Sequence, residues 1–232
     1  MQDFLSLHDA EQIAEETAPV QGPPLGRVVT GILTHPAETF REALAHPVQA
    51  HALTLAALGG VYWALNLAIA QGMGATLSLP VLLPAAVAVG LAGGVAYLFA
   101  LSILIHWSCD ILGGESTRER VRYVLAAAGV PGILALVVVG LPRILLFGQG
   151  LFMPDRPWLS ANPLLVWGLW FGDAVAFAWS LTIVVRGLKI MTGFSIGRAM
   201  LAAALPVIPI LLIGVLFVSI AWSGIFFAPP AF

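Results

Sequence analysis

Long apolar runs, separated by short polar or proline-containing segments, dominate the chain. A helix needs about 20 apolar residues to cross roughly 30 Å of hydrocarbon. Five runs pass that test, and the pattern predicts a transmembrane helix over residues 50–71, 79–107, 123–141, 163–185 and 199–222. The third helix has a longer alternative that ends at Phe147, provided that the Arg143 side chain reaches the interface.

The pattern is different before the first span, where charged and apolar positions mix. Residues 1–33 are predicted to form an acidic cytoplasmic tail, because residues 1–24 carry five Asp or Glu and no Lys or Arg. Residues 36–45 place Phe40 and Leu44 four apart with charged side chains around them. This spacing predicts a short interfacial helix lying on the membrane.

Composition supports a membrane protein. Of the 232 residues, 59% are hydrophobic and only 9% are charged, too few to cover the surface of a water-soluble globule. The acidic start gives no reason to expect nucleic-acid binding, and the single cysteine, Cys109, excludes an intramolecular disulfide. Nine Arg against one Lys, with abundant Ala, are typical of a GC-rich bacterial genome. The expected location is therefore a bacterial inner (cytoplasmic) membrane.

The distribution of Lys and Arg predicts the orientation. With the N-terminus inside, the inner segments hold eight of the ten basic residues, and only Arg143 and Arg156 fall outside. The positive-inside rule then gives a cytoplasmic N-terminus and, after five crossings, an external C-terminus. The predicted fold class is an all-α integral membrane protein with five transmembrane helices, formed by residues 34–222 and followed by a short external tail, residues 223–232.

The two inner connections repeat one pattern. Each has a Gly two residues before a Ser, then an Arg, then an Ala-rich run that ends at a Pro: Gly114, Ser116 and Pro131 in the first copy, and Gly193, Ser195 and Pro206 in the second. Ser116 and Glu119 also fit a capping box, which predicts Ser116 as the N-cap of a helix. The repeat indicates either a duplication or the generic chemistry of inner hairpins, and both interpretations stay open.

Three sets of residues in and around these hairpins carry a resemblance to a known family. They are Pro36, Phe40 and Leu44 before the first span; Leu112-Gly-Gly-Glu-Ser116 with Tyr123, Ala126 and Pro131; and Trp179, Gly187, Leu188, Gly193, Ser195 and Ala199 around the second inner connection. They resemble the Yip domain family, five-span membrane proteins named for interacting with Ypt/Rab GTPases in eukaryotes and also found in bacteria. The resemblance covers roughly residues 34–222 and implies a cytoplasmic N-terminus. An Asp-Leu-Tyr-Gly-Pro element, usual in the eukaryotic branch, is absent from residues 1–48, so a Rab-type GTPase is not an expected partner.

Asp173 is the candidate intramembrane polar site. It lies ten residues into the fourth span, about 15 Å deep, where an unpartnered carboxylate is costly to ionise. One hypothesis is a proton or cation relay. The hypothesis we favour is a protonated acid hydrogen-bonded to a neighbouring helix through Tyr62, Asn66 or a freed backbone carbonyl, with Ser180 on the same stripe. On that basis we expect Asp173→Asn to preserve folding.

Two further groups are weighed against simpler explanations. His106, Cys109 and Asp110 are metal-ligand types at helical spacing, but three ligands from one turn rarely satisfy a tetrahedral ion. We therefore expect an ordinary interfacial boundary there and no metal or other cofactor. Small residues on the apolar helices allow close helix approach, and we favour packing within the bundle over a dimer face. They are Gly59 and Gly60, Gly90 with Gly93 and Gly94, and Gly129 with Gly132.

These observations predict a non-enzymatic membrane adaptor or organiser. No nucleophile elbow, phosphate loop or paired cysteines is present, and no inner loop is large enough for an active site. The expected partners are the lipid bilayer and another membrane protein, a peripheral protein or a second copy of the chain. The expected headgroup or partner contacts are Arg118, Arg120, Arg122, Lys189 and Arg198. The alternative is a small carrier or channel subunit that uses Asp173.

Overall fold

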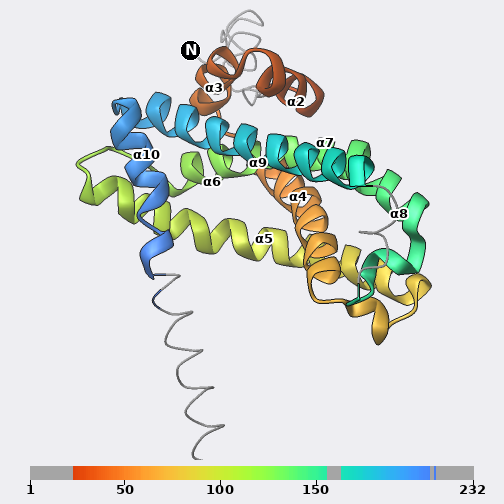
Figure 1. Cartoon of the computed structure of the whole chain (residues 1–232). Helices are drawn as coiled ribbons and strands as arrows, with labels where there is room; N and C mark the ends of the chain where they lie inside the picture. The colour runs from red at the N-terminus through yellow and green to blue at the C-terminus, as the bar shows by residue number, and fades with distance from the viewer. Residues whose placement is uncertain (1–22, 156–162, 210–211, 213–232) are drawn as a thin grey trace, which may run out of the picture.

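The computed structural model describes residues 23–155, 163–209 and 212, and every regular element in that part of the chain is helical (Figure 1). The all-helical prediction is therefore confirmed for these residues. The α-helices are α2 (Leu25–Thr34), α3 (Pro36–Ala45), α4 (Gln49–Ala70), α5 (Leu79–Ile111), α6 (Arg118–Ala127), α7 (Val130–Ala135), α8 (Leu141–Phe147), α9 (Pro163–Thr192) and α10 (Ile196–Ala204). Two 3₁₀ turns, η1 (Met73–Ala75) and η3 (Gly148–Phe152), and one π segment, η2 (Leu136–Gly140), complete the described part.

Four helical stretches of the described residues are long and apolar enough to cross a membrane. They match the first four predicted spans. The first, Gln49–Ala70, is shifted by one residue, and the other three run further than predicted, over Leu79–Ile111, Arg118–Phe152 and Pro163–Thr192. Residues Ile196–Pro209 form a shorter apolar helix. The rest of the predicted fifth span, Leu212 apart, lies outside the described residues, as do the N-terminal 22 residues and the C-terminal tail.

The third stretch is helical throughout but interrupted. Pro131 lies in the first turn of α7 and Pro142 in the first turn of α8, where a missing N–H costs least. Between them the π segment η2 takes up the change in register. The stretch therefore follows the longer of the two predicted versions. Arg143 falls inside α8 and is 5% exposed, whereas the orientation count had placed it in an outer loop.

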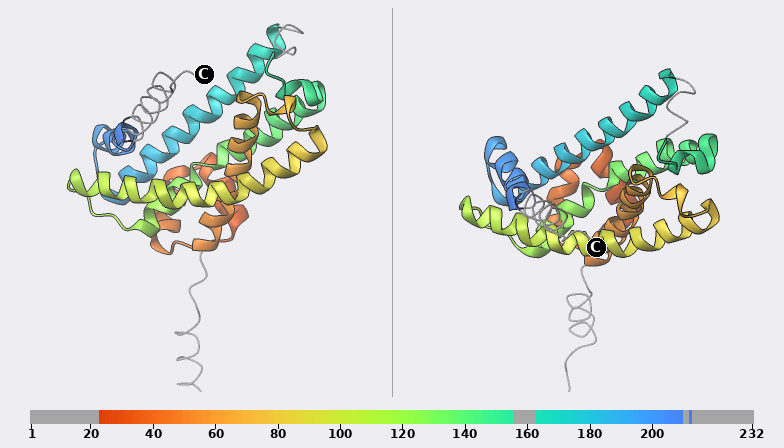
Figure 2. Two further views of the ribbon diagram at one scale, coloured as in Figure 1. Left: turned by 90° about the horizontal axis from the view of Figure 1, so that it is seen from below. Right: turned by 60° about the horizontal axis from the view of Figure 1, so that its bottom comes forward.

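The two longest helices lie on opposite sides of the bundle (Figures 1 and 2). Helices α4, α6 and α7 lie between α5 and α9: α4 packs against α5, and α6 and α7 connect that pair to α9. The most extensive contact is the one between α4 and α5. It is a very close approach, since an added Cβ on Gly60 would overlap the carbonyl oxygen of Gly90 and lie 2.6 Å from Cα of Gly94. These glycines pack within the bundle, as the sequence favoured.

Helices α2 and α3 form a pair at one edge of the bundle (Figure 1). Helix α2 falls largely within the residues expected to form a tail, and its Val28 and Ile32 are fully buried. Helix α3 covers the predicted range 36–45, and its Phe40 is fully buried against Gly187 of α9. The apolar face of α3 therefore packs on protein, where we had expected it to lie on the membrane.

Candidate functional site

The intramembrane polar site joins three helices around Asp173. The Asp173 carboxylate of α9 forms an ion pair with Arg143 of α8, with Nη1 2.6 Å from Oδ2. Its other oxygen, Oδ1, accepts a hydrogen bond of 2.6 Å from the hydroxyl of Tyr62 on α4. The Asp173 side chain is 26% exposed and that of Arg143 only 6%. Helices α4, α8 and α9 are therefore held together by one charged, hydrogen-bonded group.

The ion pair changes the sequence-based interpretation of Asp173. Tyr62 is a partner, as expected, but the sequence suggested no buried cation, because the third span was predicted to end at residue 141 and Arg143 was counted in an outer loop. Helix α8 continues through them and buries the guanidinium. A carboxylate–guanidinium pair thus replaces the protonated acid that we favoured. Asn66 joins through Tyr62, since its Nδ2 donates to the Tyr62 carbonyl at 2.9 Å, whereas Ser180 lies two helical turns away.

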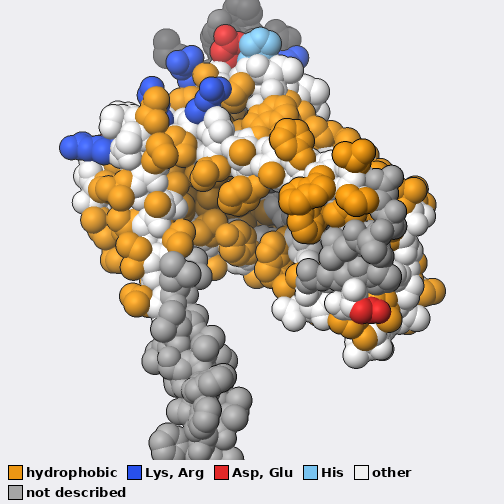
Figure 3. Space-filling view, viewed as in Figure 1, with side chains coloured by type: hydrophobic (Ala, Val, Ile, Leu, Met, Phe, Trp, Pro, Cys, Tyr) orange, Lys and Arg blue, Asp and Glu red, His pale blue; other side chains and the backbone are white. Residues whose placement is uncertain are grey.

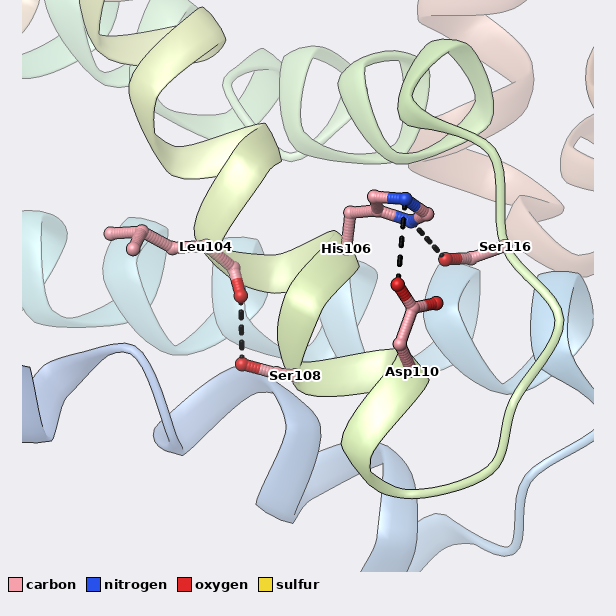
Figure 4. Close-up of polar contacts among 5 residues, drawn as sticks. All are labelled: Leu104, His106, Ser108, Asp110 and Ser116. Atoms are coloured by element: carbon pink, nitrogen blue, oxygen red, sulfur yellow. Dashed lines mark hydrogen bonds and ion pairs between the residues drawn. The ribbon is translucent and has the colours of Figure 1, made fainter.

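Near the C-terminal end of α5, the side chain of His106 ties the first inner connection to the helix (Figure 4). Its Nδ1 lies 2.7 Å from Oγ of Ser116, and its Nε2 lies 3.5 Å from Oδ2 of Asp110. Ser, His and Asp also form hydrolase triads. Here, however, the Asp110 contact is longer than a good hydrogen bond, and the Asp110 side chain is 52% exposed. We interpret the group as a tether for the loop.

The same geometry corrects the capping prediction. Thr117 is the N-cap of α6 and accepts from the backbone N–H of Arg120 at 3.4 Å, while Ser116 is engaged with His106. The N-cap therefore lies one residue later than expected, and because Arg120 follows it three residues on, the expected Ser–x–x–Glu box is not formed. Cys109, of the same predicted group, is fully buried in the core. Within the described part, no group of three or more His, Cys, Asp or Glu side chains is arranged to hold a metal ion.

The second inner connection is built in a similar way. Ser195 is the N-cap of α10 and accepts from the backbone N–H of Arg198 at 3.4 Å. Gly193 has a φ of 71°, and in the first connection Gly113 has a φ of 74°, the left-handed region that glycine enters without strain. The repeat noticed in the sequence is thus a repeat of local structure, with Gly113 in the role that we had assigned to Gly114.

The two inner connections also touch. Phe194, which is 6% exposed, packs its ring over Gly114, where an added Cβ would overlap the ring. The sequence carried no local signal for this contact, because the residues are 80 positions apart. We call the surface formed by residues 112–118 and 192–198 the inner hairpin face.

Gly114→Ala is expected to displace the Phe194 ring from its packed position over residue 114 and to lower the free energy of unfolding by about 1–3 kcal/mol. Gly197→Ala is the matched control, since nothing lies within 4 Å of its added Cβ, and it should leave stability unchanged or slightly raised. Thermal unfolding of the detergent-purified proteins measures both. Equal stability of the two variants would show that Phe194 does not couple the connections.

Basic side chains gather at this end of the molecule, in the upper left of Figure 3, over a surface that is otherwise largely apolar. The exposed ones near the inner hairpin face are Arg118, Arg120, Arg186, Lys189 and Arg198. Arg122 differs, because its guanidinium lies 4.8 Å over the ring of Phe99 and is partly buried. Arg186 was missing from the predicted contacts, although its inner-loop position gave the same signal as that of Lys189.

A comparison with protein families identifies a match over most of the chain. The model of the Yip1 domain matches residues 30–220, which include both inner connections and the three residues of the intramembrane site. A search of curated proteins and a search of solved structures each returned no match.

Proposed function

The chain belongs to the Yip1 domain family, a family of membrane proteins, and from that premise we propose that it is a non-enzymatic membrane adaptor or organiser. The inner hairpin face is its working surface: the basic residues hold anionic lipid headgroups, and the face between them docks a membrane or peripheral protein. The observation that carries the proposal is the packing of Phe194 on Gly114, because it joins two separate loops into one surface.

Charge supports the orientation in this proposal. Eight of the ten basic residues fall on the side that we take as cytoplasmic, and the basic side chains visible in Figure 3 gather at the end that holds the inner hairpin face. We propose that the apolar helix Ile196–Pro209 begins a fifth span, which would put the C-terminus outside. We further propose a bacterial inner membrane as the location.

The alternative of a carrier or channel subunit gains no support from the site geometry. A relay residue has to exchange its proton or cation, but Asp173 is engaged on both oxygens, by Arg143 and by Tyr62. The cavity beside this site, about 10 Å³, has the space that one water molecule needs. An ion pair of this kind fixes helices more readily than it carries a solute.

The headgroup contacts are tested by replacing Arg118, Arg120, Lys189 and Arg198 with Gln. Each exposed cation near an anionic surface contributes about 1 kcal/mol, so we expect a large, salt-sensitive loss of co-purifying anionic lipid and of any partner. Gentle detergent extraction at low and high salt, followed by lipid and protein quantification, measures it. Arg27→Gln with Arg41→Gln is the control, since these exposed cations lie on α2 and α3.

Unchanged recovery of lipid and partner from the fourfold variant would overturn the proposed role of the basic residues. Arg122 is left out of the set, because its removal would also disturb the packing on Phe99. A loss that is equal in the control would assign the effect to net charge and not to the inner hairpin face.

A further inference from the structure

A small cavity lies beside the ion pair, between α4, the π segment η2, α8 and η3. Its volume is about 10 Å³. Most of its lining is apolar, and the polar side chains that line it are Tyr62, Asn66 and Arg143. This place is distinct from the inner hairpin face, and the adaptor function makes no use of it.

Arg143 brings unsatisfied donors to this cavity. The residue is 95% buried by its relative exposure of 5%, and only its Nη1 is used in the pair with Asp173. Its Nε and Nη2 are buried and have no hydrogen-bond partner within the described part of the chain. A buried charged donor left without an acceptor is destabilising, because it has lost its hydration without a replacement. The guanidinium therefore calls for an acceptor, and the cavity lined by Arg143 is the place nearest at hand for one.

The cavity also offers a hydrogen-bond acceptor to a molecule bound in it. The Nδ2 of Asn66 donates to the Tyr62 carbonyl, which leaves the side-chain oxygen of Asn66 free to accept. Leu136 and Gly140 of the π segment line the same cavity.

Size and charge decide what the cavity takes. A volume of about 10 Å³ matches one water molecule and is small for a halide or a phosphate group. The charges of Arg143 and Asp173 already balance each other, so an added anion would leave an unfavourable net negative charge in a low-dielectric region. A neutral molecule that both accepts and donates satisfies the guanidinium and the amide together.

We propose that this cavity is a hydration site that binds a single water molecule between the guanidinium of Arg143 and the side-chain amide of Asn66. The water accepts from Nε or Nη2 and donates to the amide oxygen. It allows Arg143 to keep its charge inside the bundle without a second acid, and it occupies the cavity without opening a path for solutes.

The test is a crystal structure of the full chain, grown in a lipid phase with sodium bromide, at a resolution that shows ordered solvent. We expect one solvent peak within hydrogen-bond distance of Arg143 Nε or Nη2, with no anomalous bromide signal. Bromide at the site would overturn the proposal in favour of an anion site, and a site without a peak would overturn it outright.

Asn66→Leu provides the matched variant, because it removes the acceptor while leaving Arg143 and Asp173 in place. The solvent peak should be lost or reduced to less than half its occupancy, with the ion pair retained. A peak of full occupancy in this variant would contradict the assigned role of Asn66. If the variant does not fold, the wild-type peak and its bromide signal still decide the proposal.

Discussion

Arg143→Met is expected to lower the free energy of unfolding by about 3–5 kcal/mol, because it leaves the Asp173 carboxylate without its cation in a low-dielectric region. Asp173→Asn should cost a similar amount, since the buried guanidinium then lacks its acceptor charge. This second expectation reverses the one drawn from the sequence, where the acid had no cationic partner and its amide was expected to preserve folding. The reversal follows from the 2.6 Å contact between Nη1 and Oδ2.

The double variant Arg143→Met with Asp173→Leu separates the interaction between the two side chains from the effect of removing each one alone. Replacing a buried pair by apolar side chains of similar volume is often neutral or stabilising, so the double variant should be more stable than either single one. A double-mutant cycle of thermal or SDS-induced unfolding in detergent measures the coupling. Arg186→Gln, at an exposed position of the same helix as Asp173, is the control and should stay within about 0.5 kcal/mol of wild type.

Additive effects of the two single variants would contradict a direct pair. The same cycle bears on function, because a proton or cation relay requires Asp173 to act independently of Arg143. Wild-type stability of Asp173→Asn, together with loss of proton flux in reconstituted vesicles, would restore the carrier alternative. Strong coupling would instead assign the group to holding α8 against α9.

The sequence predicted the helices well and their interruptions less well. Apolar runs located the first four spans, because about 20 apolar residues suffice to identify a crossing. The continuation through Pro142 and Arg143 was undecided, since a proline and a charge together are as typical of a span end as of a kinked helix. Arg143 is buried because α8 packs beside α4 and α9. The local pattern of apolar residues does not predict that packing.

The candidate site was predictable to a similar extent. Asp173 and Tyr62 were identified because a carboxylate in lipid needs a hydrogen-bond donor, which is a local argument. Ser116 was assigned as a cap one residue too early, because His106, ten residues before it, competes for its hydroxyl. The contact between Gly114 and Phe194 joins two loops that periodicity treats separately. Long-range contacts of this kind set the shape of the inner hairpin face.

Gly60→Leu is expected to be as damaging as loss of the ion pair and to lower the free energy of unfolding by about 3 kcal/mol or more. Even a Cβ at this position would overlap the carbonyl oxygen of Gly90, a backbone atom that cannot rotate away. The two helices would have to separate along their most extensive contact. Gly90 and Gly94 are four residues apart, the spacing by which small residues let two membrane helices approach.

Gly93→Ala is the control on the partner helix α5, in the same turn as Gly90 and Gly94, because nothing lies within 4 Å of its added Cβ. This variant should leave the unfolding temperature unchanged or slightly raised, since alanine favours helix over glycine by about 1 kcal/mol. Thermal unfolding and size-exclusion chromatography in detergent distinguish packing of α4 on α5 within one chain from packing between two copies of the chain. A Gly60→Leu protein that keeps its stability but loses an oligomeric state would assign this glycine to a dimer face. Loss of stability at constant oligomeric state follows from the structure, because α4 and α5 meet at Gly60, Gly90 and Gly94 within one chain.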